Sequence, residues 1–183
     1  FANLLERDGY KVLSYAGNFK KERLNDGKIL VISNALHVKN VDDWFLPNPS
    51  AFTKSEIEIL KKWVSDGGRL FLIADHMPMG GAAKDLAKAF EFEFTNGFAF
   101  DTINQGPSFF KLSDKSLHKN SITTGRNNEE NVQQVATFTG QAMKLPKAAK
   151  PIRTFGENFM NFLPDTAWVF NRNTKRYRVN GWS

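Results

Sequence analysis

Asp75 and His76 stand side by side directly after an apolar run at residues 69–74. A carboxylate and an imidazole accept and donate protons, and both are metal ligands. Asn34 and His37 follow a second apolar run, at residues 28–33. In an open α/β sheet, ligands bind in the crevice beyond the carboxyl ends of the strands. The two strand ends are therefore expected to bring these four residues to one crevice.

Three chemical interpretations of this crevice stay open. Asp75, His76 and His37 are the candidate ligands of a divalent metal. Asp75 is a candidate base or nucleophile, with His76 as the acid or base beside it. Gly80 and Gly81 open the next helix, and their backbone N–H groups are candidate donors to an anion. The competing interpretation is structural: Asp75 caps the turn, while His76 packs against its neighbours.

The candidate ligand-binding residues surround the acid–imidazole pair. Gln141 lies near the end of another expected strand, where its side-chain amide would reach a ligand. The full binding set that the sequence predicts is Asn34, His37, Gly80, Gly81 and Gln141. His118, in contrast, is interpreted as a structural residue.

The elements that position these residues are expected to alternate along the first half of the chain. Thr53 and Glu56 form a capping box, which predicts a helix that ends at Gly67. The apolar run at residues 69–74 then predicts a strand buried on both faces, and apolar spacing over residues 83–90 predicts a helix. Such alternation is typical of βαβ units. The predicted fold class is thus α/β, a three-layer sandwich with a mainly parallel, flavodoxin-like sheet.

The second half of the chain is richer in turns. Short strands are expected at residues 91–94, 130–139, 151–155 and 167–170, and another is expected near the start, at residues 10–15. We expect these short strands of the second half to form an irregular or antiparallel β extension. The basic run Arg172 to Arg178 is interpreted as a solvated turn between two strands.

Composition limits the function classes. A chain of 183 residues with 41% hydrophobic residues fits a single domain spanning residues 1–183. It has no cysteine, which excludes a disulfide, a thiolate metal site and a cysteine nucleophile. The net charge of +6 comes from scattered basic residues without a nucleic-acid motif, so nucleic acid is an unlikely partner. No run is long enough for a membrane span.

Several phrases resemble the class I glutamine amidotransferase-like superfamily. These are the strands KILVIS and RLFLIAD and the turn ADHMPMGGAA, whereas NGF, TFTGQA and NGWS resemble its bacterial DUF4350-like group. The resemblance implies a flavodoxin-like sheet, a periplasmic or secreted location, and a domain that is incomplete at both ends. The family's cysteine position at the turn holds Asp75 and His76 here, so a cysteine-dependent glutamine amidotransferase is excluded.

Two functional hypotheses follow. The first is a domain that binds a small polar molecule, with hydrolase activity that uses Asp75 and His76 in place of a thiol. The second is a non-catalytic module for protein or glycan interaction, with a degenerate pocket. The sequence leaves the reaction and any cofactor undetermined.

Overall fold

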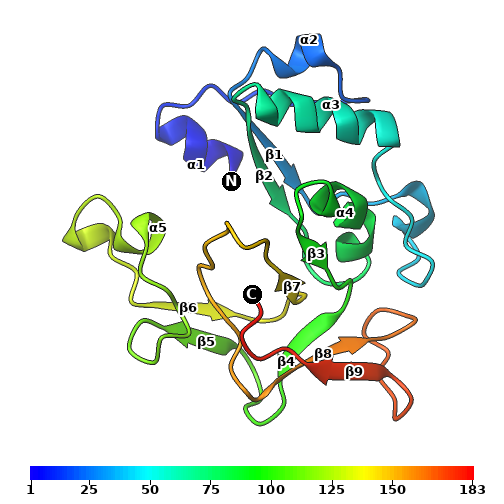
Figure 1. The fold of residues 1–183 in the computed structure, drawn as a ribbon, viewed down its shortest axis with the longest axis vertical. Helices are drawn as coiled ribbons and strands as arrows, with labels where there is room; N and C mark the ends of the chain where they lie inside the picture. Colours follow the sequence, from blue (N-terminus) through cyan, green and yellow to red (C-terminus); the bar gives the residue numbers. More distant parts are fainter.

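The computed structural model describes all residues from 1 to 183 and shows two regions with different sheet structure (Figure 1). The first region holds the longer helices and one parallel strand pair, and the second holds short antiparallel strands. No helix has the length and apolar character that a membrane crossing requires. The helical elements are α1 (Ala2–Arg7), α2 (Lys21–Leu24), η1 (Val38–Asn40), α3 (Lys54–Ser65), α4 (Met79–Lys88), α5 (Ser121–Thr124) and η2 (Asn128–Glu130).

The first region is built on the parallel pair of β1 (Ile29–Ser33) and β2 (Arg69–Ile73), in which Ile29 pairs with Arg69. Helix α3 begins at the predicted capping box, where Thr53 and Glu56 satisfy each other's backbone N–H groups. Its apolar face packs with β1, α2 and α4 in one core cluster, whose buried members are Leu24, Ile32, Ile57, Leu60, Trp63 and Leu86. The helix thus covers one face of the strand pair.

The prediction of a flavodoxin-like, mainly parallel sandwich is wrong. The structure contains a single two-stranded parallel sheet, and its other sheets are antiparallel. The prediction that the strand at residues 69–74 is buried on both faces is also wrong, because Phe71 on β2 is 50% exposed. On that face Phe71 meets the ring of Phe1, which directly precedes the short helix α1, with centroids 6.3 Å apart.

Antiparallel pairing organises the second region. Three separate sheets form, with strand orders β3-β7, β4-β8-β9 and β5-β6. Their strands are β3 (Glu93–Phe94), β4 (Phe98–Asp101), β5 (Ser108–Lys111), β6 (Gln134–Thr137), β7 (Met143–Lys144), β8 (Phe159–Leu163) and β9 (Lys175–Arg178). Most of the paired strands lie far apart in the chain, as do β4 and β8, so long segments connect them.

Several local strand predictions differ from the structure. Residues 10–15 and 167–170 are not strands, and residues 151–155 contribute an isolated bridge between Arg153 and Leu117. The basic run was predicted as a turn, but its residues 175–178 form β9, which pairs with β8. At residues 10–15, 151–155 and 167–170 the apolar pattern was too short to distinguish a strand from a loop that packs its side chains without pairing.

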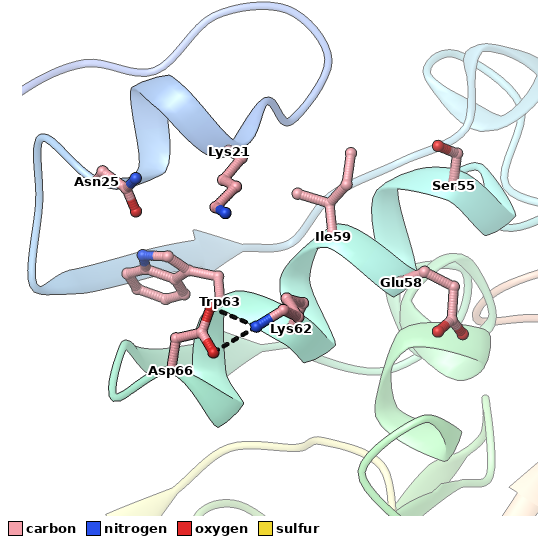
Figure 2. Close-up of a pocket in the computed structure, with 8 residues that line it drawn as sticks. All are labelled: Lys21, Asn25, Ser55, Glu58, Ile59, Lys62, Trp63 and Asp66. Atoms are coloured by element: carbon pink, nitrogen blue, oxygen red, sulfur yellow. Dashed lines mark hydrogen bonds and ion pairs between the residues drawn. The ribbon is translucent and has the colours of Figure 1, made fainter.

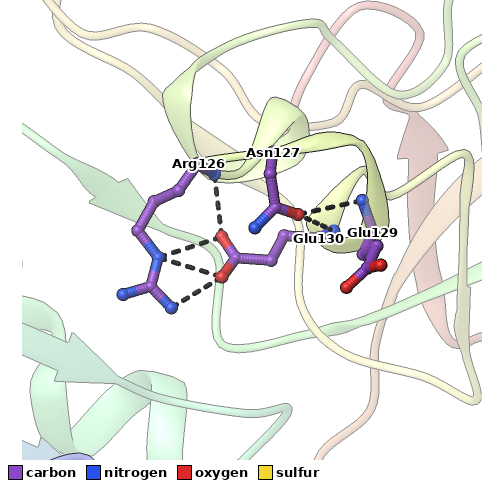
Figure 3. A network of polar contacts seen from close by, with 4 residues as sticks. All are labelled: Arg126, Asn127, Glu129 and Glu130. Carbon is purple, nitrogen blue, oxygen red and sulfur yellow. Dashed lines mark hydrogen bonds and ion pairs between the residues drawn. The ribbon is translucent and has the colours of Figure 1, made fainter.

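The segment around α5 and η2 is held by local polar contacts (Figure 3). The Arg126 side chain donates from Nη2 to Glu130 Oε1 at 2.6 Å, and the Arg126 backbone N–H donates to Glu130 Oε2 at 2.8 Å. These hydrogen bonds lower the pKa of the Glu130 carboxyl. Asn127 caps η2 by accepting from the backbone N–H groups of Glu129 and Glu130. The contacts fix a surface segment and do not form a site.

Gly68, which precedes β2, is expected to tolerate no side chain. A Cβ at this position would overlap the ring of Trp63, which is buried in the core cluster of α3. We expect Gly68→Ala to lower the free energy of unfolding by about 2 kcal/mol, because an overpacked core must shift. Urea denaturation measures this change. The control is Gly27→Ala, whose Cβ would meet only the Ile29 carbonyl oxygen at 3.8 Å; equal losses in the two variants would contradict the packing argument.

Candidate functional site

The predicted crevice lies at the carboxyl ends of β1 and β2, but the chain itself fills it with amide groups. Asn34 follows β1 and accepts a hydrogen bond from the backbone N–H of Asp75 at 2.9 Å. Gln141 donates to the carbonyl oxygens of Ala74 and Asp75 at 3.2 and 3.1 Å. Asn34 and Gln141 are therefore brought together with Asp75, as partners of its backbone.

The Asp75 side chain faces its own turn. Its Oδ1 accepts from the backbone N–H of His76 at 2.9 Å, and the Cα of Gly140 lies close to the same oxygen, since a Cβ there would be 3.7 Å away. The residue is half-buried. A carboxylate that accepts a backbone amide in this way caps a turn.

His76 points into a group of aromatic rings and is 6% exposed. Its ring stacks on Phe98 with centroids 4.4 Å apart and meets the edge of Trp168 at 4.8 Å. Its Nδ1 lies 2.7 Å from the carbonyl oxygen of Met77, a hydrogen bond that uses one ring nitrogen. The structure thus separates the directions of Asp75 and His76: one faces the turn and the other faces the rings.

Gly80 and Gly81 are covered by side chains and are buried. A Cβ on Gly80 would lie 2.5 Å from the Gln141 amide oxygen, and a Cβ on Gly81 would lie 2.7 Å from Asn48. The backbone N–H of Gly81 donates to Asn96 Oδ1 at 2.6 Å, and that of Gly80 donates to the His76 carbonyl oxygen at 3.2 Å. The two donors predicted for an anion are therefore occupied by the protein.

Asn96 and Asn48 extend the same set of contacts, and sequence reasoning missed both. The Asn96 backbone N–H donates to Gln141 Oε1 at 2.9 Å, and its side chain donates to Asn48 Oδ1 at 2.7 Å. Asn48 in turn donates to the carbonyl oxygen of Phe45 at 3.0 Å. The positive φ of 56° at Asn96 is a conformation that asparagine tolerates better than most residues. We call Asn34, Asn48, Asn96 and Gln141 the amide network.

His37 lies apart from these contacts. It caps η1 by accepting at Nδ1 from the backbone N–H of Lys39 at 3.2 Å. The structure contains no group of three or more His, Asp or Glu side chains that could hold a metal ion. Asp75, His76 and His37 are thus not assembled into the predicted metal set. His118, interpreted as structural, contacts Thr154 Oγ1 through Nε2 at 3.1 Å.

Comparison with solved structures identifies a likeness of fold. No family model and no curated protein matches the chain. A solved structure, the mmIFT52 N-terminal domain, superposes with a TM-score of 0.61 at 14% sequence identity, covering 98% of this chain and 76% of that chain.

The chain shares its fold with the mmIFT52 N-terminal domain. At this level of identity the likeness concerns the fold alone. It overturns the resemblance to the class I glutamine amidotransferase-like superfamily and its DUF4350-like group, because the shared fold is one of small, mostly antiparallel sheets. The resemblance also implied a flavodoxin-like sheet, but the structure has only two parallel strands.

This chain carries an exposed apolar patch that sequence reasoning did not identify. Trp168 was interpreted as packing, yet it is 45% exposed, and its ring lies 6.4 Å from that of Phe138, which is 69% exposed. Phe170 contacts Phe98, which also lies beneath Trp168, with ring centroids 5.3 and 4.8 Å apart. We define the apolar patch as Phe138, Trp168, Val169 and Phe170. The signal in the sequence was the run Trp168-Val169-Phe170, which stands beside charged residues and outside any periodic pattern.

Trp168 has a backbone conformation that its side chain disfavours. Its φ is 66°, in the left-handed region, where a bulky residue is an outlier. Strain of this kind persists where the surroundings hold a residue in place, and it concentrates at functional positions. Here the neighbouring backbone N–H of Ala167 donates to the Trp44 carbonyl oxygen at 2.8 Å, which anchors the segment that presents the ring.

A hollow between α2 and α3 is lined mainly by polar and charged side chains (Figure 2). It measures about 270 Å³, and Lys62, Asp66 and Trp63 are among its lining residues. Lys62 Nζ already donates to both carboxylate oxygens of Asp66, at 2.6 and 2.8 Å. Lys62 and Asp66 are thus paired with each other, and Glu58 lies 3.5 Å from Lys61 Nζ on the same helix.

Proposed function

We propose that this chain is a non-catalytic protein-interaction module and that its apolar patch binds an acidic segment of a partner. The observation that carries the proposal is the exposure of Phe138 and Trp168, whose rings adjoin, together with the exposure of Val169 and Phe170 directly after Trp168. Contiguous exposed apolar patches, when large, mark protein interaction sites. Tryptophan is also among the residues that contribute most to binding at protein interfaces.

The charge beside the patch defines the partner's chemistry. Arg172 follows Phe170 by two residues, and Lys175 and Arg176 begin β9. The Arg176 guanidinium lies 6.0 Å from the centroid of the Phe162 ring, and that ring lies 5.8 Å from the ring of Phe170. None of the ion pairs in the structure includes these basic residues. Free cations around an apolar centre complement a segment with an aromatic or aliphatic anchor and flanking carboxylates.

The surroundings of Asp75 and His76 favour this module over the hydrolase hypothesis. Asp75 accepts a backbone N–H group, and one ring nitrogen of His76 lies against a backbone carbonyl oxygen. A general base and its partner must reach a common substrate. The Asp75 and His76 side chains have separate surroundings, which supports a structural role for both residues.

Selection from a display library of random peptides tests the proposal. We expect the chain to enrich peptides in which Asp or Glu flanks an aromatic or aliphatic residue. A synthetic peptide of that pattern should bind Phe138→Ala or Trp168→Ala about 10- to 30-fold more weakly than wild type, because an interface aromatic residue is truncated. Isothermal titration calorimetry measures the affinities.

Phe109→Ala is the matched control, since Phe109 on β5 is 53% exposed and lies outside the patch. This variant should bind the selected peptide like wild type. Arg172→Glu with Arg176→Glu should weaken binding and reduce its dependence on salt. Selection without enrichment of acidic residues, or equal affinity of the Phe138 and Phe109 variants, would overturn the proposal.

A further inference from the structure

A second hollow lies where α4, β3, β7 and β9 meet, away from the apolar patch. It measures about 370 Å³, a size in the range of small-molecule sites. Its lining includes Lys84, Lys88, Glu93, Lys144, Tyr177 and Trp182. None of these residues belongs to the predicted crevice or to the amide network.

The lining has an excess of positive charge. Three ammonium groups, on Lys84, Lys88 and Lys144, face one carboxylate, on Glu93, which leaves two uncompensated charges. Lys84 and Lys88 are in no ion pair of the structure. They are one turn apart on α4, and like charges at this spacing destabilise a helix. A bound anion would remove that repulsion.

Lys144 is held between a carboxylate and a ring. Its Nζ lies 3.1 Å from Glu93 Oε2 and 4.8 Å from the centroid of the Trp182 ring. Both side chains of the ion pair are largely exposed, so the pair contributes little to stability. An anion can therefore compete for Lys144 at small cost.

The Trp182 indole and the Tyr177 phenol also line the hollow. The Tyr177 and Trp182 rings are tilted by 53° with centroids 5.6 Å apart, so they offer apolar surface to a flat group. The Tyr177 hydroxyl accepts from Asn161 Nδ2 at 3.3 Å, which leaves its own hydrogen free to donate. Burial raises the pKa of Tyr177, and the phenol stays protonated at neutral pH.

We infer that this hollow binds a small anion that carries a flat ring, of the size and charge of a nucleoside monophosphate. The phosphate would lie against Lys84, Lys88 and Lys144, and the ring would lie against Trp182 and Tyr177. Charge-assisted hydrogen bonds from ammonium groups to an anion are stronger than neutral ones, and ring stacking adds a separate contribution. The two contributions predict that neither the anion nor the ring binds well alone. The site is independent of the apolar patch and of the proposed function.

Calorimetric titration of the full chain with AMP, adenosine, inorganic phosphate and indole-3-acetate tests the inference. We expect AMP to bind at least about tenfold more tightly than adenosine or phosphate. Indole-3-acetate keeps a ring and an anion, so binding at the strength of AMP would support the same chemistry and assign the anion to a carboxylate. Phosphate binding as tight as AMP binding, or no heat with any compound up to about 1 mM, would overturn the inference.

Two double variants test whether AMP binds in this hollow. Lys84→Gln with Lys88→Gln should weaken AMP binding about tenfold or more, because two charge contacts are lost while both side chains are exposed and their removal leaves the fold intact. Lys11→Gln with Lys119→Gln removes the same charge from exposed positions that do not line the hollow, and should leave the affinity unchanged. Equal losses in the two double variants would show that net charge alone attracts the nucleotide, which overturns a site at this hollow.

Discussion

Gln141→Ala is expected to lower the free energy of unfolding by about 3 kcal/mol. The Gln141 side chain is buried and makes three hydrogen bonds to backbone groups: it donates to the carbonyl oxygens of Ala74 and Asp75 and accepts from the N–H of Asn96. Alanine would leave these groups without partners and would empty the space against Gly80. Each buried polar group that loses its partner costs about 1–3 kcal/mol, and the three losses are not additive.

Urea denaturation measures this effect, and two further variants separate its causes. Gln134→Ala, at an exposed position of β6, should change stability by no more than about 0.5 kcal/mol. Gln141→Glu keeps an acceptor for Asn96 but places a carboxylate beside two carbonyl oxygens, so it should be as damaging as alanine. If Gln141→Ala were as stable as Gln134→Ala, the amide network would not stabilise the turn at Asp75 and His76.

Local structure in the first half of the chain was the part that sequence could predict. The Thr53–Glu56 capping box and the apolar run before Asp75 were both confirmed, as α3 and β2. These signals depend on contacts between residues close in sequence, which is why they can be read without the fold. The stripe of α4 was also predicted, although the helix starts at Met79, four residues before the apolar spacing becomes regular.

Sheet topology could not be predicted, because it depends on which distant strands pair. Strand β8 carries the apolar sequence FMNFL and pairs with both β4 and β9, but nothing near Phe159 indicated its partners. The alternation of strands and helices up to Phe90 suggested a parallel sheet that the second half does not extend. The strands at residues 28–33 and 69–74 and the helices after them were predicted correctly, but the mainly parallel sheet inferred from them was wrong.

The candidate site shows the same limit. The sequence placed Asn34, Asp75 and Gln141 near one another, and the structure does bring them together. It could not show that their polar atoms satisfy backbone groups, because Gln141 is 66 residues from Asp75 and the orientation of each side chain is set by packing. Gly80 and Gly81 illustrate the point: their lack of a Cβ accommodates Gln141, Asn48 and Asn96, and not an external ligand.

His76→Ala is expected to lower the free energy of unfolding by about 3 kcal/mol, whereas His76→Phe should cost no more than about 1.5 kcal/mol. The imidazole fills a space between Phe98 and Trp168, so its removal leaves a cavity beneath the apolar patch. Phenylalanine restores the ring and loses only the hydrogen bond to Met77.

The selected acidic peptide should bind His76→Phe like wild type and His76→Ala more weakly, because Trp168 rests on the ring at position 76. Hydrolysis of model esters or amides by wild type that is abolished in His76→Phe would instead establish His76 as a catalytic residue. Packing and proton transfer make opposite demands on the same position: the first needs a ring of this size, and the second needs a nitrogen.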